Sequence, residues 1–173
     1  MLDTDIIEPS IDPKTQKIAI RNVTAVNAAG TRTKAQVRDF DPVFTDEPAS
    51  LGGTNTAPSP LEMALVSLVG CDGVIINGVA KAMKFDYAGV TLACESQIDV
   101  RGPKGVPGIR PFFESAKLDI VIFTDETEKR VEQLKKNVEF RCPVMNLFRA
   151  AGVDLDARWS SRPAAEFDGN VDA

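Results

Sequence analysis

The spacing of apolar and polar residues predicts strands near the beginning of the chain. Residues 18–26 are rich in β-branched side chains, and the NAAG turn at 27–30 leads into a second extended run over residues 31–40. Further extended residues lie around Val43. Glycines and prolines then fill residues 52–60, where they disfavour both helix and strand. We therefore expect an N-terminal hairpin followed by a loop.

A capping-box motif predicts the start of a long helix after this loop. Ser59 occupies the N-cap, a proline follows at the first helical position, and Glu62 stands three residues after the cap. Residues 63–71 are almost all apolar or small, without a polar stripe. We expect a central helix that ends near Met83 and has protein on all sides. Because glycine in a helix costs about 1 kcal/mol relative to alanine, we expect another backbone to approach closely at Gly70, Gly73 and Gly78.

Two later segments alternate between apolar and polar residues, as half-buried strands do. Residues 90–100 place Cys94 on their apolar face, and residues 112–122 carry a similar face, so these two strands should pair. Since Cys94 alternates with valine, leucine and isoleucine, we expect it to be an ordinary buried side chain.

A second helix should follow, with a capping-box-like start at Asp125 and Glu128. Its apolar stripe has spacings of three and four and comprises Val131, Leu134, Val138, Cys142 and Met145. Pro143 has no backbone N–H, so the helix should kink or restart there. A final strand is expected over residues 153–159, and the tail from Ser160 should be loosely ordered.

Length and composition fit one folded domain, residues 1–173, with its core over about residues 18–160 and loosely ordered tails. The chain is 43% apolar and 26% charged, as soluble globular proteins are. Its net charge of -5, without a basic cluster, argues against nucleic-acid binding. The acidic N-terminal residues do not match a signal peptide, so we expect a cytoplasmic protein. Polar residues interrupt the apolar helix before the roughly 20 residues that a membrane span needs, namely Asp72, Asn77 and Lys81.

The chain contains no histidine, which excludes serine–histidine and cysteine–histidine catalysis and most catalytic zinc sites. The three cysteines form no CxxC pair, and we expect neither a metal nor an organic cofactor. Taken by itself, Cys71 fits a small buried side chain. Cys142 stands at a helix discontinuity, where free backbone N–H groups and the helix dipole can lower a thiol pKa.

Two segments make the sequence similar to a known family. TNTAPSPLEMALVSLVGCDG is followed about seventy residues later by VEFRCPVMNLF. These segments resemble the two motifs of the OsmC/Ohr family, a proline-led helix that carries one cysteine and a Cys-Pro-Val motif that carries another. The order of the expected elements resembles the family over residues 18–160. The segment PSPLEM is more similar to the broader OsmC-like branch than to typical organic hydroperoxide resistance proteins.

The resemblance implies an α+β fold in which antiparallel β-sheets pack around two long central helices, within an intertwined homodimer whose active sites lie at the subunit interface. It also implies reduction of organic hydroperoxides, and less efficiently of hydrogen peroxide. Cys71 would be oxidised to a sulfenic acid, and Cys142 would resolve it as a disulfide. An external dithiol, for which the family suggests a lipoyl protein, would then reduce the disulfide.

Family members also use an arginine from the hairpin region to stabilise the thiolate, and a glutamate early in the cysteine helix to hold that arginine. Arg32 is the nearest match and Arg38 the reserve, and a solvated surface position is the alternative for each. The glutamate normally follows the proline of the motif, but Leu61 takes that place here and Glu62 comes next. One residue turns a helical side chain by about 100°, so Glu62 is either the arginine partner or only the capping-box residue.

Two other functions fit the same sequence. The first is a non-enzymatic member of the fold that binds a small apolar ligand at the dimer interface, with its cysteines merely buried. The second is a redox sensor, in which the disulfide changes a binding surface and is not turned over. Titration of the thiols with excess hydroperoxide separates these functions from a peroxidase.

Overall fold

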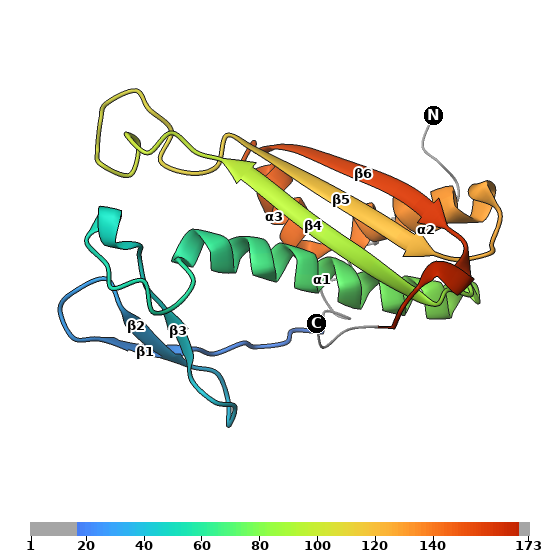
Figure 1. Ribbon diagram of the computed structural model, residues 1–173, viewed down its shortest axis with the longest axis horizontal. Helices are drawn as coiled ribbons and strands as arrows, with labels where there is room; N and C mark the ends of the chain where they lie inside the picture. Colours follow the sequence, from blue (N-terminus) through green and yellow to red (C-terminus); the bar gives the residue numbers. More distant parts are fainter. Residues whose placement is uncertain (1–16, 170–173) are drawn as a thin grey trace. The chain divides into compact units, whose positions relative to one another are not determined.

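The computed structural model describes residues 17–169, which form an α+β fold (Figure 1). Contacts divide these residues into two compact units, residues 17–66 and residues 67–169. The long helix α1 (Pro60–Met83) begins in the first unit and continues into the second. It starts and ends where the capping box and the apolar run predict.

The first unit contains a small antiparallel sheet in the order β1 (Thr24–Asn27), β2 (Thr33–Gln36) and β3 (Val43–Thr45). The predicted hairpin is therefore confirmed, with shorter strands than the sequence pattern indicates. The side chain of Asn27 stabilises the turn because its amide donates to the carbonyl groups of Gly30 and Arg32, at 3.0 and 3.3 Å. Gly30 has a φ of 146°, a conformation that glycine adopts without a steric penalty.

A buried carboxylate, Asp46, organises the loop that leads from β3 to α1. Its oxygens accept hydrogen bonds from the hydroxyl groups of Thr31, Thr54 and Thr56, at 2.6, 2.5 and 3.1 Å. The backbone N–H groups of Thr54 and Thr56 also donate to it, both at 3.1 Å. Because these bonds favour the charged form, led by those from Thr31 and Thr54, they hold the pKa of Asp46 well below its usual range. A charged side chain thus fixes a loop that has few apolar residues.

The second unit is built on a sheet in the order β4 (Gly89–Gln97), β5 (Ser115–Phe123) and β6 (Asp154–Arg162). β4 and β5 pair antiparallel, with Cys94 opposite Leu118, as the two alternating segments predict. β5 and β6 pair parallel, so the expectation of purely antiparallel sheets is wrong for this pair. The chain returns between these two strands through helices, as a parallel connection requires.

Two consecutive helices, α2 (Glu128–Arg141) and α3 (Pro143–Ala150), form that return. The single long second helix is thus replaced by two shorter ones, and they meet at Cys142, where Pro143 predicts the discontinuity. The cap at the start of α2 also differs, because the N-cap residue is Thr127 and its side chain makes no capping hydrogen bond. Asp125 instead accepts a hydrogen bond from the backbone of Ala164 at 3.1 Å.

One apolar core joins the sheet to the helices of the second unit. Its members share complete or nearly complete burial and come from α1 (Leu68, Ile76, Val79, Ala80), β5 (Leu118, Ile120, Ile122), α2 (Leu134, Val138) and α3 (Met145), together with Phe85 and Cys142. Burial of each such aliphatic side chain contributes about 1.5–3 kcal/mol. Cys142 therefore lies inside this core.

The prediction that protein surrounds α1 on all sides is not met among residues 17–169. Val74 is 70% exposed, and Gly70 and Gly78 lie on the same exposed face. A side chain at either glycine would have nothing within 4 Å among the described residues. By length and composition alone α1 could also cross a membrane, with a mean hydropathy of 1.8 in its most apolar window. Core helices of folded proteins meet the same criterion.

The last strand runs further than the sequence pattern predicts. Ser160 and Ser161 pair with β5, and β6 ends only at Arg162. Beyond it, the ring of Phe167 packs on Phe123 with 5.2 Å between centroids. The tail is therefore ordered at least to Phe167, because an aromatic anchor follows its polar residues. Residues 1–16 and 170–173, to which the expectation of loosely ordered tails also applies, lie outside the described residues.

Candidate functional site

The structure brings Cys71 and Cys142 together. Cys71 lies on the middle of α1 and is partly buried, whereas Cys142 lies between α2 and α3 and has no exposed surface. Their thiols lie within hydrogen-bonding reach of each other, and both belong to the second unit. All three cysteines are free thiols in this structure. The two cysteines of the sequence motifs are thus neighbours in space.

Cys142 has two roles in the backbone at this point. It ends α2, where its N–H donates to the carbonyl of Val138 at 2.8 Å, and it is the N-cap of α3. Its sulfur accepts a hydrogen bond from the N–H of Met145 at 3.4 Å. A thiol in the N-cap position takes the role that serine or aspartate has in most helices.

The environment of Cys142 disfavours its thiolate. Burial raises the pKa of this thiol far above its usual range, and the hydrogen bond to Asp72 raises it further. The N–H of Met145 lowers the pKa but is outweighed. The helix terminus thus lowers the pKa of Cys142 as expected, but burial and a neighbouring carboxyl outweigh this effect and the net shift is upward. These surroundings therefore favour the thiol form of Cys142 over its thiolate.

A residue that the sequence analysis did not select, Asp72, lies beside both cysteines. It follows Cys71 on α1, its side chain is fully buried, and neither carboxyl oxygen has a conventional hydrogen-bond donor within residues 17–169. Burial raises its pKa, while the contact with the Cys142 thiol lowers it. The sequence does contain a signal for this residue, because Asp72 stands in an otherwise apolar helix. A charged residue is rarely buried without a partner or a functional role.

Two charged residues of the return helices complete this cluster. Glu139 on α2 and Arg149 on α3 form an ion pair at 2.6 Å. The negative charge of Glu139 raises the pKa of Asp72, and the positive charge of Arg149 lowers it, both less than burial does. Arg149 is therefore paired with Glu139, and its charge also acts on Asp72.

Cys94 takes no part in the cysteine pair. It is partly buried on β4 and packs against the apolar core, as its alternation with aliphatic residues predicts. Burial raises its pKa, and the charge of Asp72 contributes to that rise.

The remaining candidate residues belong to the first unit. The guanidinium of Arg32 lies 4.2 Å from the ring centroid of Phe44, and that of Arg38 lies 4.4 Å from the ring centroid of Phe40. Arg32 also lines a hollow of about 440 Å³ with Lys34 and Phe44. Each arginine thus stacks on an aromatic ring, where a cation is stabilised by about 0.5–1 kcal/mol at exposed positions.

Glu62 closes the predicted capping box. The N–H of Ser59 donates to its carboxylate at 2.6 Å, and the N–H of Glu62 donates to the hydroxyl of Ser59 at 3.2 Å. These hydrogen bonds with Ser59 lower the pKa of Glu62. The carboxylate of Glu62 therefore caps the start of α1. The side chain of the neighbouring Leu61 is 41% exposed.

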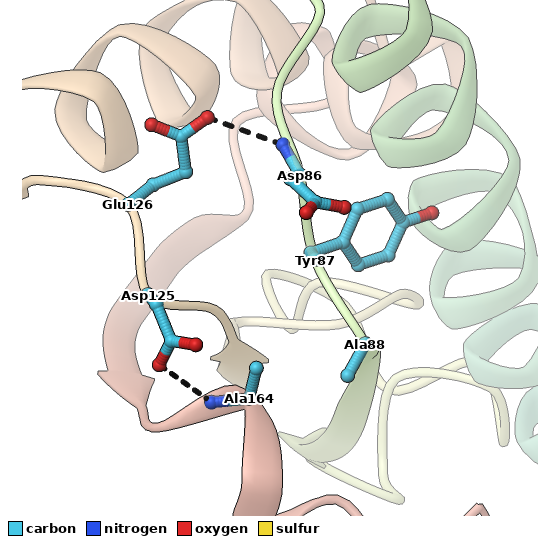
Figure 2. Close-up of a pocket in the computed structure, with 6 residues that line it drawn as sticks. All are labelled: Asp86, Tyr87, Ala88, Asp125, Glu126 and Ala164. Carbon is cyan, nitrogen blue, oxygen red and sulfur yellow. Dashed lines mark hydrogen bonds between the residues drawn. The ribbon is translucent and has the colours of Figure 1, made fainter.

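A second hollow, of about 340 Å³, lies at the end of the sheet in the second unit (Figure 2). Two of its three carboxylates have structural partners: Asp125 accepts from the N–H of Ala164, and Glu126 accepts from the N–H of Asp86 at 3.2 Å. Glu126 also forms an ion pair with Arg130 at 2.7 Å. Within residues 17–169, no group of three or more cysteine or carboxylate side chains is arranged to hold a metal ion.

Comparison with known proteins identifies the family and the fold. The family model described as OsmC-like protein matches residues 53–158. No curated protein matches the chain significantly in sequence. Among solved structures, the OsmC-like protein from Mycoplasma pneumoniae superposes with a TM-score of 0.70 at 18% identity, over 83% of this chain and 97% of that protein.

Two solved structures of organic hydroperoxide resistance proteins have the same fold. The protein from Elizabethkingia anophelis superposes with a TM-score of 0.67 at 17% identity, over 86% of this chain and all of that one (100%). The protein from Legionella pneumophila, named OsmC, superposes with a TM-score of 0.62 at 18% identity, over 84% of this chain and 98% of that one. Since the family model covers more than half of the sequence, the chain belongs to the OsmC-like protein family.

Proposed function

We propose that this protein is a thiol-dependent peroxidase that reduces organic hydroperoxides, and hydrogen peroxide less efficiently. In the first step the thiolate of Cys71 attacks the peroxide, which leaves a sulfenic acid on Cys71 and releases an alcohol. Cys142 then forms a disulfide with Cys71 and water leaves. An external dithiol, such as a lipoyl protein, returns both cysteines to thiols.

The contact between the thiols of Cys71 and Cys142 is the observation that carries this proposal. A sulfenic acid is protected from further oxidation only when a second thiol lies within reach. The different burial of the two cysteines supports the order of the steps, because the partly exposed Cys71 is open to a peroxide and the buried Cys142 is not. The family membership and the hydroperoxide resistance proteins of the same fold support the same chemistry.

The remaining parts of the mechanism follow the family resemblance. Arg32, with Arg38 as the reserve, is the cation assigned to the thiolate of Cys71. Glu62 is not assigned to hold that arginine, since its carboxylate closes the capping box. We propose a cytoplasmic homodimer. The exposed face of α1 with Gly70, Val74 and Gly78 supports this proposal, because a second copy of the chain could pack against it.

A titration with hydroperoxide tests the proposal. The reduced protein is mixed with tert-butyl hydroperoxide, with and without dihydrolipoate, while peroxide and free thiols are measured. We expect two thiols to disappear without the dithiol, and continuous consumption of peroxide with it. Cys94→Ala is the matched control, because it removes a cysteine outside the pair, and it should lose the same two thiols.

The other two functions give different results in the same titration. A redox sensor loses two thiols once but shows no sustained consumption when the dithiol is present. A ligand-binding protein with inert cysteines loses none. Either result would reject the peroxidase.

A further inference from the structure

The carboxyl group of Asp72 lies next to Cys71 on α1 and near the thiol of Cys142, and no other side chain of residues 17–169 forms a hydrogen bond with it. It is fully buried, and neither of its oxygens accepts an N–H or O–H hydrogen bond within residues 17–169. An unsatisfied buried polar group costs about 1–3 kcal/mol, and a charged one costs more. An apolar side chain at this position would therefore give a more stable protein. We infer that the carboxyl group of Asp72 has a role in the chemistry of the cysteine pair.

Groups from four elements act on Asp72, and the thiol of Cys142 is the one in hydrogen-bonding contact with it. Cys142 contributes its thiol from the junction of α2 and α3, and Cys71 is the preceding residue on α1. Glu139 cannot donate while it is paired with Arg149 at 2.6 Å, and Arg149 is committed to that pair. The charge of Asp72 raises the pKa of Cys94 on β4, but the side chain of Cys94 packs against the core. The Cys142 thiol is the group that donates toward the Asp72 carboxyl.

We propose that Asp72 is the proton acceptor for the Cys142 thiol in the step that forms the disulfide. This inference rests on the peroxidase proposal and adds a catalytic residue to it. Cys142 needs such an acceptor because its side chain has no exposed surface, so bulk water does not reach its thiol to take the proton. The thiolate is the nucleophile in disulfide formation, so the proton must leave before or during the attack.

The step balances without another reactant. The S–H proton of Cys142 moves to a carboxylate oxygen of Asp72, and the sulfur of Cys142 attacks the sulfur of the Cys71 sulfenic acid. The S–S bond forms as the S–O bond of the sulfenic acid breaks, and the departing hydroxide takes the proton from Asp72 and leaves as water. The sulfur of Cys142 is oxidised, the sulfur of Cys71 is reduced, and Asp72 returns to its carboxylate.

The test compares disulfide formation in the wild type and in Asp72→Asn, which keeps the shape of the side chain and removes the base. After one equivalent of tert-butyl hydroperoxide, a 1,3-dione traps the Cys71 sulfenic acid at successive times, and mass spectrometry measures sulfenic acid and disulfide. We expect sulfenic acid to form normally, and the disulfide to form about 100-fold more slowly, a usual contribution of a general base. Asp72→Glu should recover part of the rate. Asp119→Asn on β5, the same substitution at a partly exposed position, should behave as the wild type.

The pH dependence separates a base from a structural residue. In the wild type, disulfide formation should rise with pH until Asp72 is ionised and then level off, with the midpoint above the ordinary aspartate pKa because burial raises it. In Asp72→Asn the rate should keep rising with pH, since only ionisation of the Cys142 thiol itself then helps. Matching pH profiles in the two proteins would overturn the role of Asp72.

A second measurement does not depend on peroxide. In a Cys71→Ser, Cys94→Ala background, Cys142 is the only thiol, and its ultraviolet thiolate absorbance gives its pKa. Asp72→Asn should lower that pKa, and an unchanged value would reject the contact. Equal disulfide rates in wild type and Asp72→Asn would reject Asp72 while the peroxidase stands. A wild type that forms no sulfenic acid would reject the peroxidase and, with it, the proton transfer.

Discussion

The three cysteines have three different environments, and these environments predict three different variants. Cys71→Ser should reduce peroxide consumption to background, because it removes the attacking sulfur. Cys142→Ser should allow one round, after which Cys71 is oxidised to sulfinic acid for lack of a resolving thiol. Cys94→Ala should turn over at nearly the wild-type rate. Steady-state peroxide assays with mass spectrometry of each cysteine make the comparison, and a sulfinic acid on Cys142 in Cys71→Ser would reverse the assignment.

The first turn of α1 allows the role of Glu62 to be separated from that of a catalytic carboxylate. Glutamine also closes a capping box, so Glu62→Gln should preserve both the fold and the peroxidase rate within about twofold. Leu61→Glu places a carboxylate directly after the proline, and it should increase the rate if it holds an arginine for the Cys71 thiolate. Each 1.4 kcal/mol of stabilisation in the transition state corresponds to about a tenfold change in rate.

Ser59→Ala is the matched control for this pair, because it breaks the cap without touching either carboxylate position. It should lower the melting temperature and leave the rate per folded molecule unchanged. An inactive Glu62→Gln, together with a Leu61→Glu rate equal to wild type, would identify Glu62 as the arginine partner.

Within the elements, the buried carboxylate of Asp46 makes the stability of the β3–α1 loop depend on pH. Its pKa in the folded state is lowered by hydrogen bonds from Thr31 and Thr54, whereas the unfolded value is about 3.8. The carboxylate therefore stabilises the fold fully above the unfolded pKa, and this contribution is lost as the pH falls toward the folded pKa. Asp46→Asn should lower the melting temperature clearly at pH 7 and less at pH 2, which lies between the unfolded and the folded pKa.

Thermal unfolding and amide exchange in β2 and β3 measure this effect. Asp41→Asn is the control, because Asp41 is an exposed aspartate in the same unit. A difference between Asp46→Asn and wild type that is as large at pH 2 as at pH 7 would show that shape, and not charge, holds the loop.

The elements themselves could largely be predicted from the sequence, because the signals that set them are local. The capping box at Ser59 fixes the start of α1, and Pro143 fixes the break between α2 and α3. The parallel pairing of β5 with β6 could not be predicted from local pattern, since a strand with one apolar face can pair in either direction. The raised pKa values of Asp72 and Cys142 were also missed, because they arise from residues about seventy positions apart.

For the whole molecule, the exposed face of α1 predicts a second copy of the chain. Val74→Glu would place a charge in the middle of this face, where burial against a partner costs several kcal/mol. The variant should shift the protein from dimer to monomer in analytical ultracentrifugation. Thr91→Glu is the control, because it adds the same side chain at an exposed position of β4. A wild type that is already monomeric at micromolar concentration would contradict the homodimer.

The sulfur of Cys142 is also the N-terminal cap of α3, which couples the oxidation state of the protein to the dynamics of its backbone. The Met145 N–H donates to this sulfur only while it stays at the cap. A sulfur that turns toward Cys71 gives up that hydrogen bond, and loss of a cap costs about 1 kcal/mol. Amide exchange at Met145 should then be about fivefold faster in the disulfide form, while the amides of β5 keep their rates. Equal exchange in both forms would show that the sulfur bridges without leaving the cap. If exchange at Met145 is faster in the disulfide form, oxidation of the cysteine pair opens the first turn of α3, a helix of eight residues.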